Sequence, residues 1–204
     1  MKWEIIKMQE FKRNSRVLFL GLESSGKSLL IKRLQCINKD VKDKTQFDEH
    51  TSTQPTTGFD TKVLLKSGKE FSINEVGSSM LANWNAFILD SQTIIFVIDL
   101  ENRPQLSQAA FELDMLANVH LADKSIPILV VFNKQDRCLE RSIGDQRFIE
   151  QMFEDSFEKV DIMYASALTG EGCMQVHEWI MTELHKQQKS SKQSKASCCA
   201  SLFD

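Results

Sequence analysis

The sequence predicts an α/β fold in which a mostly parallel sheet carries helices on both faces. Short apolar segments alternate with segments of helical period along the 204 residues, which is the order typical of repeated strand–helix units. Two of these segments, 93–98 and 126–132, are apolar throughout, as are strands that are buried on both sides of a parallel sheet. Because 42% of the residues are hydrophobic, the chain can also bury a full core.

Each expected element has a signal of its own. Leu30, Ile31 and Leu34 share one face of the helix expected after the first strand. Ser67-Gly68-Lys69 is a turn signal between two strand-like segments and predicts a hairpin, and Pro104 suits the first turn of a helix. The expected elements are a strand over 16–20, a helix over 27–34, a hairpin over 61–65 and 70–73, a strand over 93–98, a helix over 104–117, strands over 126–132 and 160–164, and a closing helix after Gly172.

Polar segments divide the chain into three parts. Residues 1–15 form an N-terminal extension whose apolar and basic side chains suit a short amphipathic helix, either packed on the domain or lying on a membrane. Residues 16–185 form the folded domain, within which the polar stretch 38–54 is expected to be a long loop. Residues 186–204 are basic and rich in Ser and Gln, and they are expected to form a disordered tail.

Composition indicates where in the cell the protein is expected and which classes of partner it is not expected to bind. No apolar run approaches about 20 residues, and charges interrupt the N-terminus, so neither a membrane span nor a signal peptide is expected. Five scattered cysteines then indicate reduced thiols in the cytoplasm. A net charge of −3 disfavours nucleic-acid binding. Cys198 and Cys199 follow a basic stretch; they are either lipidation sites that give a peripheral membrane contact or unmodified thiols in a solvated tail.

The segment from Gly21 to Ser28 has the pattern G-x-x-x-x-G-K-S of a phosphate-binding loop. Its glycines allow the backbone to approach a ligand closely, and its amides face an anion at the start of a helix. Lys27 would bridge the outer phosphates and Ser28 would ligate Mg²⁺. A Gly-Ser turn that merely caps a helix is the alternative, and the position between a strand and a helix argues against it. The expected phosphate contacts are Gly21, Glu23, Ser24, Ser25, Gly26, Lys27, Ser28 and Leu29.

The segment Asn133-Lys134-Gln135-Asp136 directly follows an expected strand. The Asp136 carboxylate can accept two hydrogen bonds from guanine, whereas adenine presents an acceptor at the same place and is rejected. Alone, four polar residues after a strand are commonly a plain loop. Together with the phosphate-binding loop they indicate a guanine-nucleotide site.

With these motifs the sequence resembles the Ras-like small GTPases, and among them the ADP-ribosylation-factor-like (Arf-like) branch, over about residues 16–184. Gln54-Pro55-Thr56-Thr57-Gly58-Phe59 is similar to the switch I motif of that branch, which implies that Thr56 contacts Mg²⁺ and the γ-phosphate. Ser166-Ala167-Leu168 resembles the last guanine-contacting element, whose Ala167 amide would meet the base carbonyl. The resemblance implies the three-layer P-loop NTPase fold, with six strands of which one edge strand is antiparallel.

The switch II segment, 74–79, departs from the family pattern. Gly77 is kept and its amide would meet the γ-phosphate. Glu75 replaces an Asp near Mg²⁺ and would act through water, and Ser79 stands where the family has the Gln that orients the attacking water. These departures, the long segment before Thr56 and the presence of Trp84 together resemble the sixteenth Arf-like subtype.

The resemblance implies a switch that binds GTP or GDP with Mg²⁺ and recruits effectors, typically in membrane traffic. An effector would bind near Phe59 and Trp84, and the exchange factor and the activating protein cannot be named from the sequence. Intrinsic hydrolysis is expected to be weak because of Ser79. The alternatives are a GTP-binding scaffold that does not hydrolyse its ligand and a P-loop nucleotide kinase, against which the segment 133–136 argues.

Overall fold

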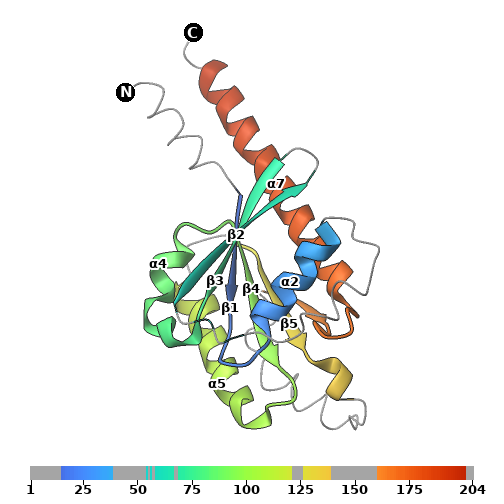
Figure 1. The fold of residues 1–204 in the computed structure, drawn as a ribbon. Coiled ribbons are helices and arrows are strands. Elements are labelled where there is room, and N and C mark those ends of the chain that lie inside the picture. The colour runs from blue at the N-terminus through green and yellow to red at the C-terminus, as the bar shows by residue number, and fades with distance from the viewer. Residues whose placement is uncertain are drawn as a thin grey trace.

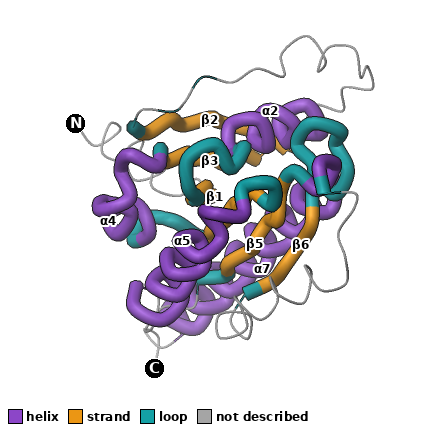
Figure 2. The backbone as a smooth tube through the Cα atoms, turned by 90° about the horizontal axis from the view of Figure 1, so that it is seen from below, coloured by secondary structure: helices purple, strands orange, loops and turns teal. Residues whose placement is uncertain are grey.

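The computed structural model describes residues 15–38, 54, 56, 58–66, 69–120, 126–138 and 160–200. Most of the N-terminal extension and nearly all of the expected loop at 38–54 lie outside the described residues. The sheet has six strands in the order β2-β3-β1-β4-β5-β6, and the β2–β3 pair alone is antiparallel among them. Figure 2 shows this succession, with the hairpin at one edge and β6 at the other. The predicted fold class, including one antiparallel edge strand, is therefore confirmed.

The strands lie close to their predicted positions. The parallel strands are short and apolar, and β4 and β5 are buried along their whole length, as their uninterrupted apolar sequences predict. The hairpin is longer than predicted, because the ladder runs from Phe59↔Val76 to Lys66↔Lys69. The strands are β1 (Ser15–Leu20), β2 (Phe59–Lys66), β3 (Lys69–Val76), β4 (Thr93–Asp99), β5 (Ile128–Asn133) and β6 (Asp161–Tyr164).

Helices cover both faces of the sheet, as Figure 1 shows. Alternate residues of β1 divide the core: Val17 and Phe19 pack with α2 (Lys27–Asn38) and α7 (Cys173–Ala200), whereas Leu18 and Leu20 pack with α4 (Trp84–Ile88) and α5 (Arg103–Asp114). This follows from the two-residue period of a strand. The structure also has short helical segments at Ser78–Asn83, Met115–His120 and Gln135–Arg137.

The closing helix is longer than the expected folded domain. Its range runs past Lys186 as far as Ala200, into the segment for which a disordered tail is predicted. No Gly or Pro interrupts 173–200, and Lys, Gln and Ala are good helix formers, so nothing in this stretch ends the helix that begins at Cys173. In Figure 1 the end of α7 extends beyond the sheet.

The parallel strands direct their carboxyl ends to one edge of the molecule, where ligands bind in open α/β sheets. Strand β1 ends at the loop that opens with Gly21, β3 ends before Gly77, and β5 ends at Asn133. The loop after β6 brings Ser166 and Ala167 to the same edge. All predicted motifs therefore meet there.

Candidate nucleotide-binding site

The loop between β1 and α2 depends on its two glycines. Gly21 has φ +144° and Gly26 has φ +88°, a region in which L side chains are strained. A Cβ at Gly21 would lie 2.3 Å from the carbonyl oxygen of Val97, and one at Gly26 would lie 2.3 Å from Asn133 Nδ2. The pattern of the motif is thus required by close backbone packing against β4 and β5.

Lys27 is buried, with 6% of its surface exposed, and points back into the loop. Its Nζ donates to the carbonyl oxygens of Gly21 and Leu22, both at 2.9 Å, and to Ser25 Oγ at 3.4 Å. Burial lowers the pKa of Lys27 to about 8, while the nearby carboxylates of Glu75 and Glu23 act in the opposite direction. A partly desolvated cation surrounded by oxygen atoms suits an anionic ligand.

Ser28, Thr56 and Glu75 converge from α2, the segment before β2, and β3. The Ser28 hydroxyl donates to Glu75 Oε1 at 2.5 Å, the Thr56 hydroxyl contacts the same oxygen at 3.1 Å, and the two hydroxyls are 3.2 Å apart. These are the three residues that the sequence assigns to Mg²⁺. Two hydroxyls and one carboxylate are hard oxygen ligands, and Mg²⁺ sites in nucleotide-binding proteins use few protein ligands. The donor set therefore fits the ion.

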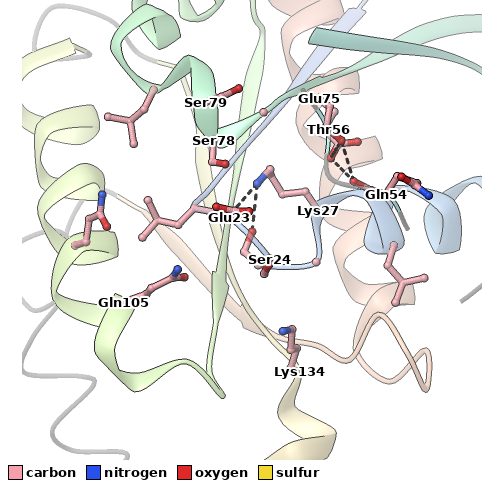
Figure 3. A pocket seen from close by; sticks show the side chains of 18 residues that line it. Glu23, Ser24, Lys27, Gln54, Thr56, Glu75, Ser78, Ser79, Gln105 and Lys134 are labelled. Atoms are coloured by element: carbon pink, nitrogen blue, oxygen red, sulfur yellow. Dashed lines mark hydrogen bonds between the residues drawn. The ribbon is translucent and has the colours of Figure 1, made fainter. Parts of the chain in front are cut away.

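A cavity of about 590 Å³ lies over these residues. In Figure 3 Lys27 and the Glu75–Thr56 pair lie on one side of it, and Gln105 from α5 lies on the other. The phosphate-binding loop, from Glu23 to Leu29, lines it together with Gly77 and Ser79. Lys134 extends the lining toward the loop after β5. This volume lies in the range of small-molecule and cofactor sites.

At the other end, Asn133 holds two loops together. Its Nδ2 donates to the carbonyl oxygen of Ser25 at 2.8 Å, and its Oδ1 accepts from the Ala167 N–H at 3.0 Å. Asn133 is buried, with 1% of its surface exposed. The phosphate-binding loop and the loop after β6 are thus fixed relative to each other by one side chain.

Asp136 has a carboxylate oxygen, Oδ1, that is buried and has no hydrogen-bond partner among the residues that the structure describes. A buried acceptor without a partner is costly, so it is a place where a ligand donor is expected. Lys134 sits between these residues with φ +64°, and its Nζ binds Asp99 Oδ2 at 2.7 Å. The orphan oxygen suits the two N–H donors of guanine.

The comparisons with known proteins agree with this geometry. A model of the "ADP-ribosylation factor family" matches residues 2–184. The chain belongs to the ADP-ribosylation factor family. Curated relatives include ADP-ribosylation factor-like protein 1 of Saccharomyces cerevisiae, 28% identical over 176 residues and covering 85% of this chain and 89% of that protein. Another is ADP-ribosylation factor K of Dictyostelium discoideum, 25% identical over 187 residues and covering 89% of this chain and 91% of that protein.

A solved structure supports the fold. The Arl6 BBS3 small GTPase of Trypanosoma brucei, with the bound nucleotide analogue GppNp, superposes with a TM-score of 0.66 and 17% identity. The match covers 85% of this chain and 99% of that chain. The predicted membership of the Arf-like small GTPases, with their GTP-binding P-loop fold, is confirmed.

In this family member, switch I and switch II contact each other directly. The Gly77 N–H donates to the carbonyl oxygen of Gly58 at 2.7 Å, and a Cβ at Gly77 would lie 2.1 Å from the carbonyl oxygen of Thr56. The amide assigned to the γ-phosphate is therefore occupied within the chain. Ser79 is exposed on the rim of the cavity, so its assignment as the residue that replaces the catalytic Gln stays a prediction.

The two aromatic residues near the expected effector site differ in exposure. Trp84 is 4% exposed and packs edge-on against Phe96 in the core, with ring centroids 6.0 Å apart. Phe59 is 46% exposed and stacks on Phe87 at 4.9 Å. The sequence alone cannot tell which aromatic side chain of a short helix turns toward the sheet.

Ser166, which the resemblance assigned to the base, supports its own loop, and three further residues near the site were not predicted from the sequence. Ser166 is fully buried, and its hydroxyl accepts from the Thr169 N–H at 3.0 Å, so its side chain holds the loop. Sequence reasoning missed Asp99, although its position just after an apolar strand was a usable signal. Gln105 and Gln108 on the cavity wall had no such signal, because their helix shows only its apolar spacing.

Proposed function

We propose that this protein is a guanine-nucleotide-binding molecular switch of the Arf-like kind that cycles between GDP and GTP forms. The single observation that carries the proposal is the buried, unpartnered Oδ1 of Asp136, beside an Asn133 that joins the base end to the phosphate-binding loop. In the GTP form it would recruit effectors for membrane traffic. The switch II departures favour the sixteenth Arf-like subtype.

In this proposal Lys27 exchanges the carbonyl oxygens of Gly21 and Leu22 for oxygens of the outer phosphates. Ser28 and Thr56 would hold Mg²⁺, with Glu75 acting through water. Bound Mg²⁺ neutralises part of the phosphate charge. Thr56 and Gly77 are the residues through which the two switches would respond to the outer phosphate, because they belong to the pair of segments that contact each other here.

The test of base recognition is Asp136→Asn. The Asn amide donates where the carboxylate accepted, so GTP affinity should fall about 10²-fold or more, and xanthosine triphosphate should bind better than it does to the wild type. Fluorescence competition titrations measure both. Wild-type protein that binds ATP as tightly as GTP would contradict the guanine assignment and would favour a P-loop nucleotide kinase.

A second candidate function is a GTP-binding scaffold that does not hydrolyse its ligand. The observation that favours it is Ser79, a short side chain on the cavity rim at the position of the family's Gln. Single-turnover release of phosphate separates the two functions. A GTPase turns over slowly alone and faster with an activating protein, whereas a scaffold keeps its GTP.

For location, we propose a cytoplasmic protein with a peripheral membrane contact through the basic C-terminal segment. None of the helices in the described part of the chain combines the length and the apolar character that a membrane crossing requires. The cysteines at 198 and 199 fall in the last turn of α7, and lipidation plus the basic stretch would supply two anchoring signals.

The double variant Cys198→Ser, Cys199→Ser should leave GDP affinity unchanged and reduce the membrane fraction of the protein in cells. Unchanged fractionation would contradict lipid anchoring.

A further inference from the structure

Arg33 joins the helix that follows the phosphate-binding loop to the loop at the base end of the site. Its Nε donates to the carbonyl oxygen of Ala167 at 3.2 Å, and its Nη2 donates to the carbonyl oxygen of Leu168. A planar guanidinium that binds two successive carbonyls fixes the orientation of two successive peptide groups. No motif in the sequence pointed to this residue.

The loop that Arg33 binds also closes on itself. The Gly170 N–H donates to the carbonyl oxygen of Ser166 at 2.8 Å. Gly170 has φ +90°, and a Cβ at this position would lie 3.4 Å from Cζ of Arg33, so the glycine packs against the guanidinium. Arg33 therefore ties this compact loop to α2, the helix whose first residue is Lys27.

Fixing the Ala167 carbonyl also fixes the Leu168 N–H. Both groups belong to one trans peptide and point in opposite directions. The Ala167 N–H already donates to Asn133 Oδ1 at 3.0 Å. The Leu168 N–H has no hydrogen-bond partner among the described residues. The loop thus presents one free donor, and Arg33 sets its direction.

We propose that Arg33 is a positioning residue that aims the Leu168 N–H at the carbonyl of the guanine base. It thereby controls the rate at which the nucleotide is released. It also controls the preference for a purine that carries a carbonyl at this position. The inference rests on the proposed guanine-nucleotide function, and it places the contact on Leu168 where the sequence had placed it on Ala167. Arg33 itself does not touch the nucleotide; it acts through the loop.

The experiment compares Arg33→Ala with the wild type, with the conservative Arg33→Lys, and with Gln35→Ala, a matched change on the same helix. Dissociation rates and affinities are measured for GDP, for 6-thio-GDP, whose thiocarbonyl is a weak acceptor, and for IDP, which lacks the amine that Asp136 would bind. Arg33→Ala should release GDP about tenfold faster, as expected when one hydrogen bond to the base is weakened. Its preference for GDP over 6-thio-GDP should shrink, while its preference for GDP over IDP should stay as in the wild type.

Arg33→Lys keeps the charge and can bind one carbonyl, so it should fall between the wild type and Arg33→Ala, and Gln35→Ala should match the wild type. Equal weakening of all three nucleotides would mean that Arg33 only packs the loop, and it would overturn the inference. Unchanged release of GDP, or no preference of the wild type for GDP over 6-thio-GDP, would overturn it as well. Failure of the wild type to bind GDP at all would instead overturn the proposed function.

Discussion

The two ends of the nucleotide site are built differently. At the base end, Asn133 fixes two loops through bonds at 2.8 and 3.0 Å, and the buried Oδ1 of Asp136 is left without a partner. At the phosphate end every strong group is satisfied within the chain: Lys27 by loop carbonyls, and the Ser28 and Thr56 hydroxyls by Glu75. The base end leaves an acceptor without a partner among the described residues, whereas the phosphate end must exchange internal partners to bind a ligand.

This difference separates recognition from switching. In the proposed function the base end would select guanine, because its unpartnered acceptor would gain a bond and lose none. In the proposed function the phosphate end would exchange an arrangement closed on itself for one closed on the ligand, which is what a switch requires. The Gly77 N–H donates to the Gly58 carbonyl, so the two switch segments contact each other and would change partners together when the ligand binds.

The largest expected effect breaks the phosphate end outright. Lys27→Ala removes a buried cation that faces several oxygens. The other lysine on the cavity lining, Lys134, is paired with Asp99, so nucleotide affinity should fall by about 10³-fold or more. A titration with fluorescent GDP measures it.

The matched control is Lys62→Ala, which removes a half-buried lysine paired with Asp60 at 2.7 Å on the hairpin, away from the cavity lining, and should leave GDP affinity unchanged. Near-normal binding by Lys27→Ala would show that the base end alone carries the affinity, and the contrast between the two ends would then disappear.

A smaller effect concerns hydrolysis and sharpens what the phosphate end lacks. Even a Gln-bearing relative turns over at only ~10⁻⁴ s⁻¹ unaided, and Ser79 is too short to hold a water and contact the γ-phosphate at once. Wild-type protein should therefore hydrolyse GTP more slowly than that. Ser79→Gln should bind GTP with unchanged affinity and raise the single-turnover rate about tenfold if the turn Ser78–Asn83 permits the family geometry. Unaided hydrolysis near one per second would contradict this view of switch II.

The sequence predicted the components of the site better than their partners. The phosphate-binding loop and the segment from Asn133 to Asp136 are contiguous motifs at strand ends, and strand ends of a parallel sheet meet at one edge. The bond between the Gly77 N–H and Gly58, and the tie from Arg33 to Ala167, join segments distant in the chain and leave no local pattern. Such contacts are decided by packing, which single-sequence reasoning does not reach.

Two features were not fixed by local sequence pattern. The segment after Lys186 is polar, which favours disorder, but its Lys, Gln and Ala residues can also extend a helix at little cost once the costly first turn exists. The orientation of Trp84 was also not predictable: it lies near switch II, and its large apolar ring is buried against Phe96.

The smallest effect expected is a dependence of nucleotide affinity on pH, and its sign follows from Lys27. Burial lowers the pKa of Lys27 from 10.5 to about 8 in the protein without ligand. Phosphate oxygens favour the charged ammonium and raise this pKa on binding, so above pH 8 binding must take up a proton. GDP affinity should fall about fourfold between roughly pH 7 and 8.5, the change in the protonated fraction of a group with a pKa of about 8.

The unfolding free energy of the nucleotide-free protein should instead rise with pH. The unfolded chain binds more protons than the folded one between pH 8 and 10.5, so the unfolding free energy rises through that window. Calorimetry in two buffers of different ionisation heat measures the proton uptake, and thermal unfolding measures the stability. An affinity that is flat across this range with no proton uptake would falsify the assignment of the buried ammonium to the phosphates.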